Sequence, residues 1–228
     1  MTEALIFANG SLGGLAMLPD PARFGLVIAA DGGLRHALNA GLTPNVVVGD
    51  LDSAPSELLQ LAERRGAEVI RHPVDKDKTD LELALDLAVE RGYRGIVVVG
   101  ALGGRIDHEM ANVLLLASPR YRDVNIRLEG APDSGGSSPR ASPDYDIRLV
   151  TDGASVDGEP GDILSLLPFA VEAQGVTLSG LRYPLVDGTL EQGSTRGMSN
   201  VMIEPVASVA VRSGTLLLIH LPASGLDR

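Results

Sequence analysis

The stretch VVVGDLDSAP, residues 46–55, joins an apolar β-branched run to two carboxylates that stand one residue apart. A run of valines that ends in Gly-Asp is typical of a buried strand entering a tight turn. Asp50 and Asp52 could cap the helix that follows this turn, or they could hold a cation where the strand ends. The sequence on either side is needed to choose between these roles.

Short apolar runs alternate with helical patterns over residues 1–128. The predicted strands cover residues 4–8, 26–30, 46–49, 67–71 and 95–100, and the predicted helices cover residues 56–66, 79–92 and 107–118. Thr79 and Glu82 form a capping box at the start of the second of these helices. Strands that alternate with helices predict βαβ units around a mainly parallel sheet with flanking helices.

The character of the sequence changes near residue 130. Residues 129–146 (EGAPDSGGSSPRASPDYD) are rich in Gly, Ser and Pro, which predicts a flexible linker or insertion. Short apolar runs with turn residues between them follow at 147–150, 162–167, 175–179, 181–186, 200–204, 207–212 and 214–221. We therefore expect an α/β domain over residues 1–128 and a smaller all-β sandwich domain over residues 147–228.

Composition excludes several classes of protein. The formal net charge of −11 argues against a nucleic-acid-binding surface, because phosphate backbones are held by clustered Lys and Arg. The absence of cysteine excludes disulfides, thiolate metal sites and a Cys nucleophile. No signal-peptide pattern opens the sequence, and no apolar stretch approaches the roughly 20 residues that span a bilayer. We therefore expect a cytoplasmic protein with no nucleic-acid or membrane partner.

Aspartates follow four successive predicted strands. They are Asp31, then Asp50 and Asp52, then Asp75, Asp77 and Asp80, and finally Asp107. In a parallel sheet these loops open at the carboxyl edge of the strands, where open α/β folds bind ligands. Each aspartate alone is explained by a turn or a helix cap, but so many carboxylates at one edge repel each other unless cations neutralise them. Oxygen ligands favour Mg²⁺ or Ca²⁺, and Mg²⁺ typically leaves positions for substrate phosphates.

Cationic side chains are interleaved with these acids. Lys76 and Lys78 lie in VDKDKTD, and Arg105 lies in a glycine-rich turn before a helix, where backbone N–H groups also point at a ligand. His108 either contacts phosphate, acts as a base, or is a structural histidine that bonds the turn. The sequence contains neither a Walker A motif nor a G-x-S-x-G elbow. Metal, cations and glycine turns at a sheet edge together favour phosphoryl-type transfer.

Six stretches of the chain resemble the thiamine pyrophosphokinase family, and they occur in the family's order. They are AADGGLRHALNAGLTPNVVVGDLDS (29–53), DKDKTDLELAL (75–85), GALGGRIDHEMANVLLL (100–116), GDILSLLP (161–168), GVTLSGLRYPL (175–185) and QGSTRGMSN (192–200). The resemblance implies an N-terminal α/β domain, a C-terminal β-sandwich that contributes to thiamine binding and dimerisation, and a homodimer. It also implies transfer of diphosphate from ATP to thiamine with Mg²⁺, which gives thiamine diphosphate and AMP.

The resemblance also assigns expected roles to particular residues. Asp50, Asp52, Asp77 and Asp80 match the metal ligands and, with Arg105, the catalytic residues. The residues expected to bind the nucleotide or thiamine are Asp31, Lys78, Thr79, Arg105, Asp107, His108, Asn112, Ser199 and Asn200. Ser199 and Asn200 resemble the family's thiamine-contacting segment.

Two alternative functions stay open at this point. The N-terminal motifs would equally serve a pyrophosphokinase for another hydroxymethyl heterocycle, such as a pterin, although the segment GSTRGMSN favours thiamine. A non-catalytic nucleotide or thiamine sensor on the same fold is the other alternative, and the intact pairs Asp50/Asp52 and Asp77/Asp80 argue against it.

Overall fold

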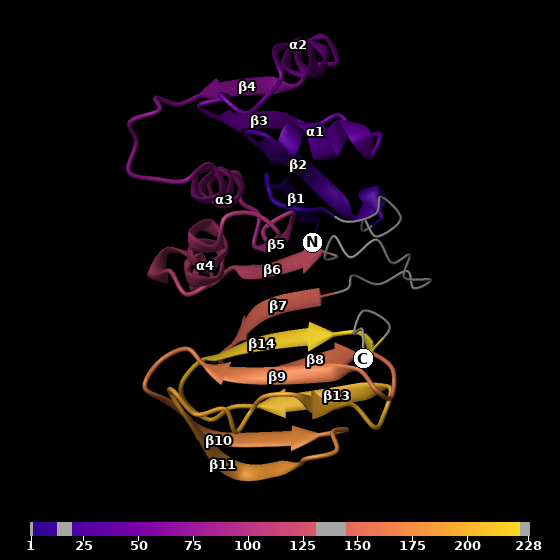
Figure 1. The fold of residues 1–228 in the computed structure, drawn as a ribbon, viewed down its shortest axis with the longest axis vertical. Helices are drawn as coiled ribbons and strands as arrows, with labels where there is room; N and C mark the ends of the chain where they lie inside the picture. The colour runs from indigo at the N-terminus through magenta and orange to yellow at the C-terminus, as the bar shows by residue number, and fades with distance from the viewer. Residues whose placement is uncertain (1, 13–19, 131–144, 224–228) are drawn as a thin grey trace. The chain divides into compact units, whose positions relative to one another are not determined.

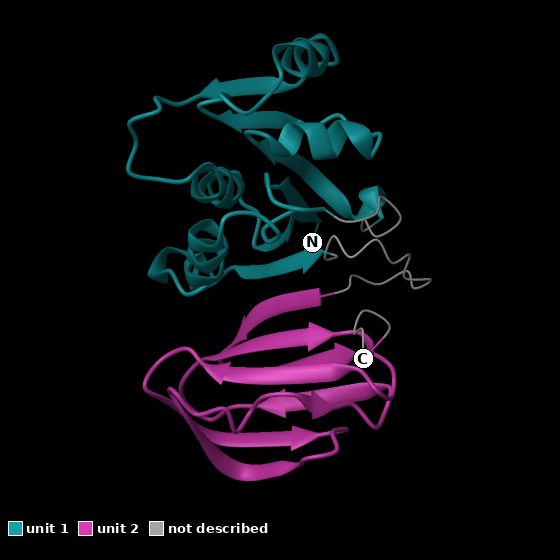
Figure 2. Ribbon diagram, in the orientation of Figure 1, with its two compact units in different colours: residues 1–143 teal, residues 144–228 magenta. Residues whose placement is uncertain are grey.

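The protein is seen here as a computed structural model that describes residues 2–12, 20–130 and 145–223. The chain divides into two compact units, residues 1–143 and residues 144–228 (Figure 2). Residues 131–144, the middle of the predicted linker, lie outside the described residues. The two ends of that predicted linker belong to strands instead, because Glu129 and Gly130 end one strand and Tyr145 and Asp146 begin the next.

The first unit is built on a sheet whose strands pair in parallel throughout the described residues. Its strands are β1 (Glu3–Phe7), β2 (Phe24–Ala30), β3 (Val46–Gly49), β4 (Glu68–Arg71), β5 (Gly95–Val99) and β6 (Asn125–Gly130). They lie in the order β4-β3-β2-β1-β5-β6 (Figure 1). The prediction of a mainly parallel sheet is confirmed, and β6 is a strand that the sequence patterns missed.

Four α-helices of the described residues connect these strands. They are α1 (Gly33–Asn39), α2 (Ser56–Arg64), α3 (Asp80–Glu90) and α4 (Ile106–Leu115), and the short 3-10 helices η2 (Pro21–Arg23) and η3 (Pro119–Tyr121) accompany them. The helix α1 was not predicted because it is only 7 residues long and starts after Gly32, which offers no side-chain cap. None of the described helices is long and apolar enough to cross a membrane.

Both faces of the parallel sheet are covered. Leu34 and Ala37 of α1 and Leu59 of α2 pack on one face, against strand residues such as Val47 and Val97. The helix α3 also contacts β1, β2 and β3. Strand residues of both orientations are fully buried, as expected for a parallel sheet with helices on both sides.

The first strand of the chain lies inside the sheet, not at its edge. From β1 the chain adds β2, β3 and β4 on one side, and then returns to add β5 and β6 on the other. The loops after β1 and β5 therefore diverge at the carboxyl end of two adjacent strands. Such a topological switch point is where open α/β sheets form their ligand crevice.

The second unit is a β-sandwich, as predicted. Its strands are β7 (Tyr145–Val150), β8 (Gly153–Asp157), β9 (Ile163–Pro168), β10 (Glu172–Ser179), β11 (Leu185–Glu191), β12 (Asn200–Val201), β13 (Val206–Ala210) and β14 (Leu216–Leu221). They form one layer in the order β12-β9-β14-β7 and a second layer in the order β11-β10-β13-β8. The described part of this unit contains no α-helix.

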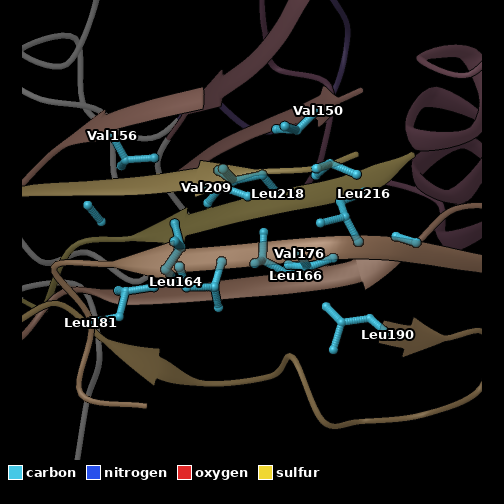
Figure 3. Packing of buried hydrophobic residues seen from close by; sticks show 14 of the residues in the cluster. Val150, Val156, Leu164, Leu166, Val176, Leu181, Leu190, Val209, Leu216 and Leu218 are labelled. Atoms are coloured by element: carbon cyan, nitrogen blue, oxygen red, sulfur yellow. The ribbon is translucent and has the colours of Figure 1, made fainter. Parts of the chain in front are cut away.

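The core of the sandwich comes from alternate residues of the two layers. Leu164, Leu166 and Leu218 of one layer join Val176 and Val209 of the other in a single buried cluster (Figure 3). The predicted strand at 181–186 is wrong in its first half, because β11 begins only at Leu185. Pro184 explains this difference, since proline cannot donate a hydrogen bond to a sheet.

Candidate active site

The turns after β2 and β3 do not use their aspartates to cap helices. The helix α2 begins at Ser56 behind Pro55, and α1 begins behind Gly32; neither of these N-cap residues makes a side-chain capping bond. Asp50 instead accepts a long hydrogen bond of 3.3 Å from the backbone N–H of Asp52. The helix-cap explanation for the carboxylates after β3 is therefore excluded, and the cation explanation remains.

Three carboxylates converge at the ends of β2 and β3. Asp31, Asp50 and Asp52 each present one oxygen, and the three oxygens lie within 4.8 Å of one another. Ser53 supports this acidic cluster: its N–H donates to Asp31 Oδ1 at 3.3 Å, and its hydroxyl donates to Asp52 Oδ1 at 2.9 Å. A cluster of hard oxygen donors at this spacing suits a divalent cation such as Mg²⁺.

Lys76 ties a fourth carboxylate to the cluster. Its Nζ donates to Asp50 Oδ2 at 2.6 Å and forms an ion pair with Asp80 Oδ1 at 3.1 Å. The hydrogen bond from Lys76 lowers the pKa of Asp50. Burial alone would lower the pKa of Lys76, but its bonds to Asp50 and Asp80 outweigh this effect and raise it. The ammonium thus stays charged and offsets part of the negative charge of the cluster.

Asp31 is in a different electrostatic position. Its side chain is buried, with 6% of the residue exposed. Burial raises its pKa, and the negative charges of Asp80 and Asp52 act in the same direction, while the hydrogen bond from Ser53 opposes them. A bound cation would reverse this balance by favouring the charged carboxylate.

Unusual backbone conformations hold the cluster together. Asp31 and Leu51 adopt positive φ angles of 46° and 64°, in the left-handed region that is uncommon for residues other than glycine. Gly49 has a φ of 146°, and a Cβ atom there would lie 2.8 Å from Asp80 Oδ1. Only glycine lets the end of β3 approach Asp80 this closely. Such backbone strain is common where a functional site fixes its side chains.

A cavity of about 540 Å³ opens over these residues. It is lined by the loops after β1, β2, β3 and β5, by Val74 and Lys76, and by residues 78–81 before and at the start of α3. Of the residues predicted from the sequence, the lining includes Asp31, Asp50, Asp52, Lys78, Thr79, Asp80, Arg105, His108 and Asn112. The carboxyl edge of the sheet therefore gathers residues from five separate segments, at the switch point between β1 and β5.

Two of the predicted aspartates do not line this cavity. Asp77 is exposed and stands outside the lining, between Lys76 and Lys78, which both belong to it. Asp107 is also exposed, and Arg105 donates to both of its oxygens at 3.1 and 2.6 Å. This hydrogen bonding lowers the pKa of Asp107 and raises that of Arg105.

Several predicted ligand-binding residues have partners within the protein. Lys78 Nζ donates to Asp86 Oδ2 at 2.5 Å, and Thr79 caps α3 by accepting from the N–H of Glu82 at 3.2 Å. Asn112 donates to the carbonyl of Ala101 at 2.7 Å, which fixes the start of the turn after β5. These contacts position the cavity wall.

Ser199 and Asn200 lie in the second unit and have contrasting surroundings. The Asn200 amide is buried; it donates to the carbonyl of Tyr183 at 2.7 Å and accepts from the N–H of the same residue at 3.0 Å. Ser199 is exposed with a positive φ of 55°, and its N–H donates to the hydroxyl of Ser165 at 3.0 Å. Asn200 therefore holds the backbone, while the side chain of Ser199 is presented at the surface.

The cavity lining also includes residues that were not among the predicted site residues, and three of them are polar or charged residues with a clear position. Asn9 follows β1 at the switch point, Lys76 bonds the cluster, and Glu109 accepts from the N–H groups of Gly103 and Gly104 at 2.8 Å each. The contact between Lys76 and Asp80 could have been predicted from their spacing. Residues four apart lie on the same face of a helix, so the two side chains would meet if α3 began one turn earlier. Glu109 had no such signal, since its bonds depend on the shape of the glycine turn.

Comparison with known proteins agrees with this architecture. Residues 22–128 match the family model described as thiamin pyrophosphokinase, catalytic domain, and residues 154–216 match the model described as thiamin pyrophosphokinase, vitamin B1 binding domain. The chain is 31% identical to the thiamine pyrophosphokinase of Bacillus subtilis (strain 168) over 86% of each chain.

Solved structures give the same result. The crystal structure of a thiamin pyrophosphokinase family protein from Enterococcus faecalis superposes with a TM-score of 0.80 at 26% identity and covers 100% of both chains. The thiamin pyrophosphokinase from Geobacillus thermodenitrificans superposes with a TM-score of 0.79 at 28% identity and covers 99% of this chain and 100% of its own. With its fold, its acidic cavity and these matches in both units, the chain belongs to the thiamine pyrophosphokinase family.

Proposed function

We propose that this protein is an enzyme that transfers the diphosphate group of ATP to the hydroxyl of thiamine, which yields thiamine diphosphate and AMP. The observation that carries the proposal is the convergence of Asp31, Asp50 and Asp52 in a cavity at the switch point of the sheet. The family match over residues 154–216 favours thiamine over a pterin as the acceptor.

The reaction makes one bond and breaks one. The hydroxyl oxygen of thiamine attacks the β-phosphorus of ATP, the bond from that phosphorus to the oxygen of the α-phosphate breaks, and AMP leaves. A carboxylate of the cavity accepts the hydroxyl proton as the new bond forms, because a primary alcohol is scarcely ionised at neutral pH. Most of the catalysis is positioning and charge neutralisation.

The acidic residues at the ends of β2 and β3 and at the start of α3 would hold Mg²⁺. These residues are Asp31, Asp50, Asp52 and Asp80. Oxygens of the first three lie close to one another, and Asp50 and Asp80 both form ion pairs with Lys76. When bound, Mg²⁺ supplies positive charge that neutralises the phosphate oxygens. Asp77, which does not line the cavity, is not needed for this role.

The remaining cavity residues would bind the substrates. Arg105 and His108 lie on the turn after β5 and at the start of α4, and the guanidinium of Arg105 would pair with phosphate. Thiamine carries a permanent positive charge, which the carboxylates favour. In the second unit we propose that Ser199 contacts thiamine, while Asn200 keeps the segment in place.

We further propose that the protein acts as a cytoplasmic homodimer. Three apolar side chains of α4 are exposed at four-residue spacing: Ile106 (70%), Met110 (61%) and Leu114 (59%). A stripe of this kind on a helix is typical of a protein contact, and a second copy of the chain would cover it. Light scattering of Met110→Glu tests this, because a charge in the contact should shift the protein toward the monomer.

The test of function is AMP release from ATP with thiamine, with and without Mg²⁺, in wild type and two matched variants. Asp80→Asn should lower the Mg²⁺-dependent rate by about 100-fold, because it removes a charge from the cluster. Asp77→Asn, three residues earlier and outside the cavity, should retain a rate within about twofold of wild type. Turnover with hydroxymethylpterin but not with thiamine, or equal losses in the two variants, would overturn the proposal.

A further inference from the structure

A buried carboxylate next to the cavity has no part in the proposed chemistry. Asp86 lies in the second turn of α3, is 6% exposed, and does not line the cavity. It nevertheless has three partners: Lys78 Nζ donates to it at 2.5 Å, the Tyr121 hydroxyl donates to it at 2.9 Å, and Arg120 Nε forms an ion pair with it at 2.5 Å. A buried carboxylate needs such partners. Arg120 also pairs with Glu90 at 3.7 Å, so its charge is shared between two carboxylates.

The contact to Lys78 differs from the other two. Arg120 and Tyr121 belong to η3, beyond α4; the Arg120 side chain is 48% exposed, whereas Tyr121 reaches Asp86 from the interior. The Tyr121 side chain is fully buried, and burial followed by its bond to Asp86 raises its pKa far above the usual range. Lys78 belongs to the segment between β4 and α3, and it does line the cavity. Asp86 thus connects η3, through Tyr121 and Arg120, to Lys78 in the cavity wall.

The segment that Lys78 belongs to carries part of the acidic cluster. Two residues before Lys78, Lys76 bonds Asp50; two residues after it, Asp80 pairs with Lys76. Between them, Thr79 is fixed by its cap bond to the N–H of Glu82. The Lys78–Asp86 bond is therefore the contact that ties the middle of this segment to the body of the unit.

We infer that Asp86 is a positioning residue that, through Lys78, holds residues 76–80 in the geometry that brings Lys76 and Asp80 to the metal-binding carboxylates. The expected loss of activity rests on the proposed function. The expected loss of metal binding does not, because metal binding is measured without substrates. Residues behind metal ligands commonly contribute in this way, and their loss typically costs about 10–100-fold in metal affinity or activity.

The experiment compares Lys78→Met, Asp86→Asn and Tyr121→Phe in the full chain. Mn²⁺ binding is measured by electron paramagnetic resonance without substrates, and Mg²⁺-dependent AMP release is measured separately. Lys78→Met and Asp86→Asn should each weaken Mn²⁺ binding and raise the half-saturating Mg²⁺ concentration by about 10-fold. The double variant should be no worse than either single one, because both remove the same link. Lys78→Arg should recover most of the loss, since it keeps a cationic donor.

Tyr121→Phe is the matched control. It removes a hydrogen bond to the same carboxylate but leaves the bond to Lys78, so it should lower stability to urea without changing Mn²⁺ binding. Lys78 is partly exposed, with 33% of its side chain accessible, so Lys78→Met should fold even if Asp86→Asn does not. Normal Mn²⁺ binding by Lys78→Met, or an equal loss in Tyr121→Phe, would overturn the inference. If the variants bind Mn²⁺ more weakly but the wild type does not convert thiamine to thiamine diphosphate, only the proposed function is refuted.

Discussion

Replacing Gly49 with alanine tests how closely β3 must approach α3. The φ of 146° places this residue where an L side chain is strained, at a cost of about 1–3 kcal/mol. The new Cβ would lie 2.8 Å from Asp80 Oδ1 and 3.2 Å from Asp31 Cβ, and real contacts begin near 3.4 Å. The Asp80 carboxylate must therefore retreat from the end of β3 by roughly half an ångström. Since misplacement by about 1 Å can cost 100-fold in rate, we expect the Mg²⁺-dependent kcat/KM to fall by about 10-fold or more.

Gly66→Ala supplies the control for this experiment. Gly66 follows α2 with a φ of 93°, but nothing lies within 4 Å of a Cβ atom built there. The free energy of unfolding of Gly66→Ala, measured by urea denaturation, should therefore fall by about 1–2 kcal/mol, a loss similar to that of Gly49→Ala. Its activity should stay at the wild-type level. The measurements are urea curves and initial rates of AMP formation across a Mg²⁺ titration, compared where each variant is fully folded. The reasoning fails if Gly49→Ala loses no more activity than Gly66→Ala.

Three further predictions concern stability. Burial raises the pKa of Asp31 in the folded protein above 3.8. Ionisation of this buried carboxylate therefore does not destabilise the protein below pH 3.8. The destabilisation grows as pH rises toward the folded-state pKa and is complete above it. Asp31→Asn should thus stabilise the metal-free protein at pH 7 relative to wild type, with the difference vanishing in acid and the Mg²⁺-induced rise in Tm lost. Lys76→Met should destabilise the metal-free protein at pH 7 by about 1–3 kcal/mol, because the ion pairs of Lys76 with the carboxylates are lost. In a thermal-shift assay, Mg²⁺ should raise the Tm of this variant more than that of wild type. Asn200→Ala should cost about 1–3 kcal/mol in urea denaturation, because the N–H and C=O of Tyr183 lose their partner, whereas Ser199→Ala should remain near wild type.

The parallel sheet and the edge where the site lies could be read from the sequence. The alternation of valine-rich runs with helical patterns determines that the loops after β2, β3 and β5 open on one side, and this places Asp31, Asp50 and Asp52 together. The prediction worked because strand direction in a βαβ unit depends on local pattern and connection length.

Details that depend on contacts between distant segments could not be read. Asp77 and Asp80 are three residues apart and looked equivalent, yet only Asp80 faces Lys76, because the cap at Thr79 sets where α3 begins. The bond from Lys78 to Asp86 was not readable either, because Asp86 is held in turn by η3, which lies some 40 residues farther along the chain than Lys78. The role of Asn200 likewise depends on Tyr183 in a separate strand connection.

The central position of β1 also has a consequence for how the protein is made. Ala4 pairs with Ile96, so one side of the first strand has no neighbour until the ribosome has released most of the first unit. During that interval an apolar strand edge is open to other nascent chains, which is a recognised hazard of parallel sheets. We expect the growing polypeptide to need a chaperone until β5 emerges and closes the gap.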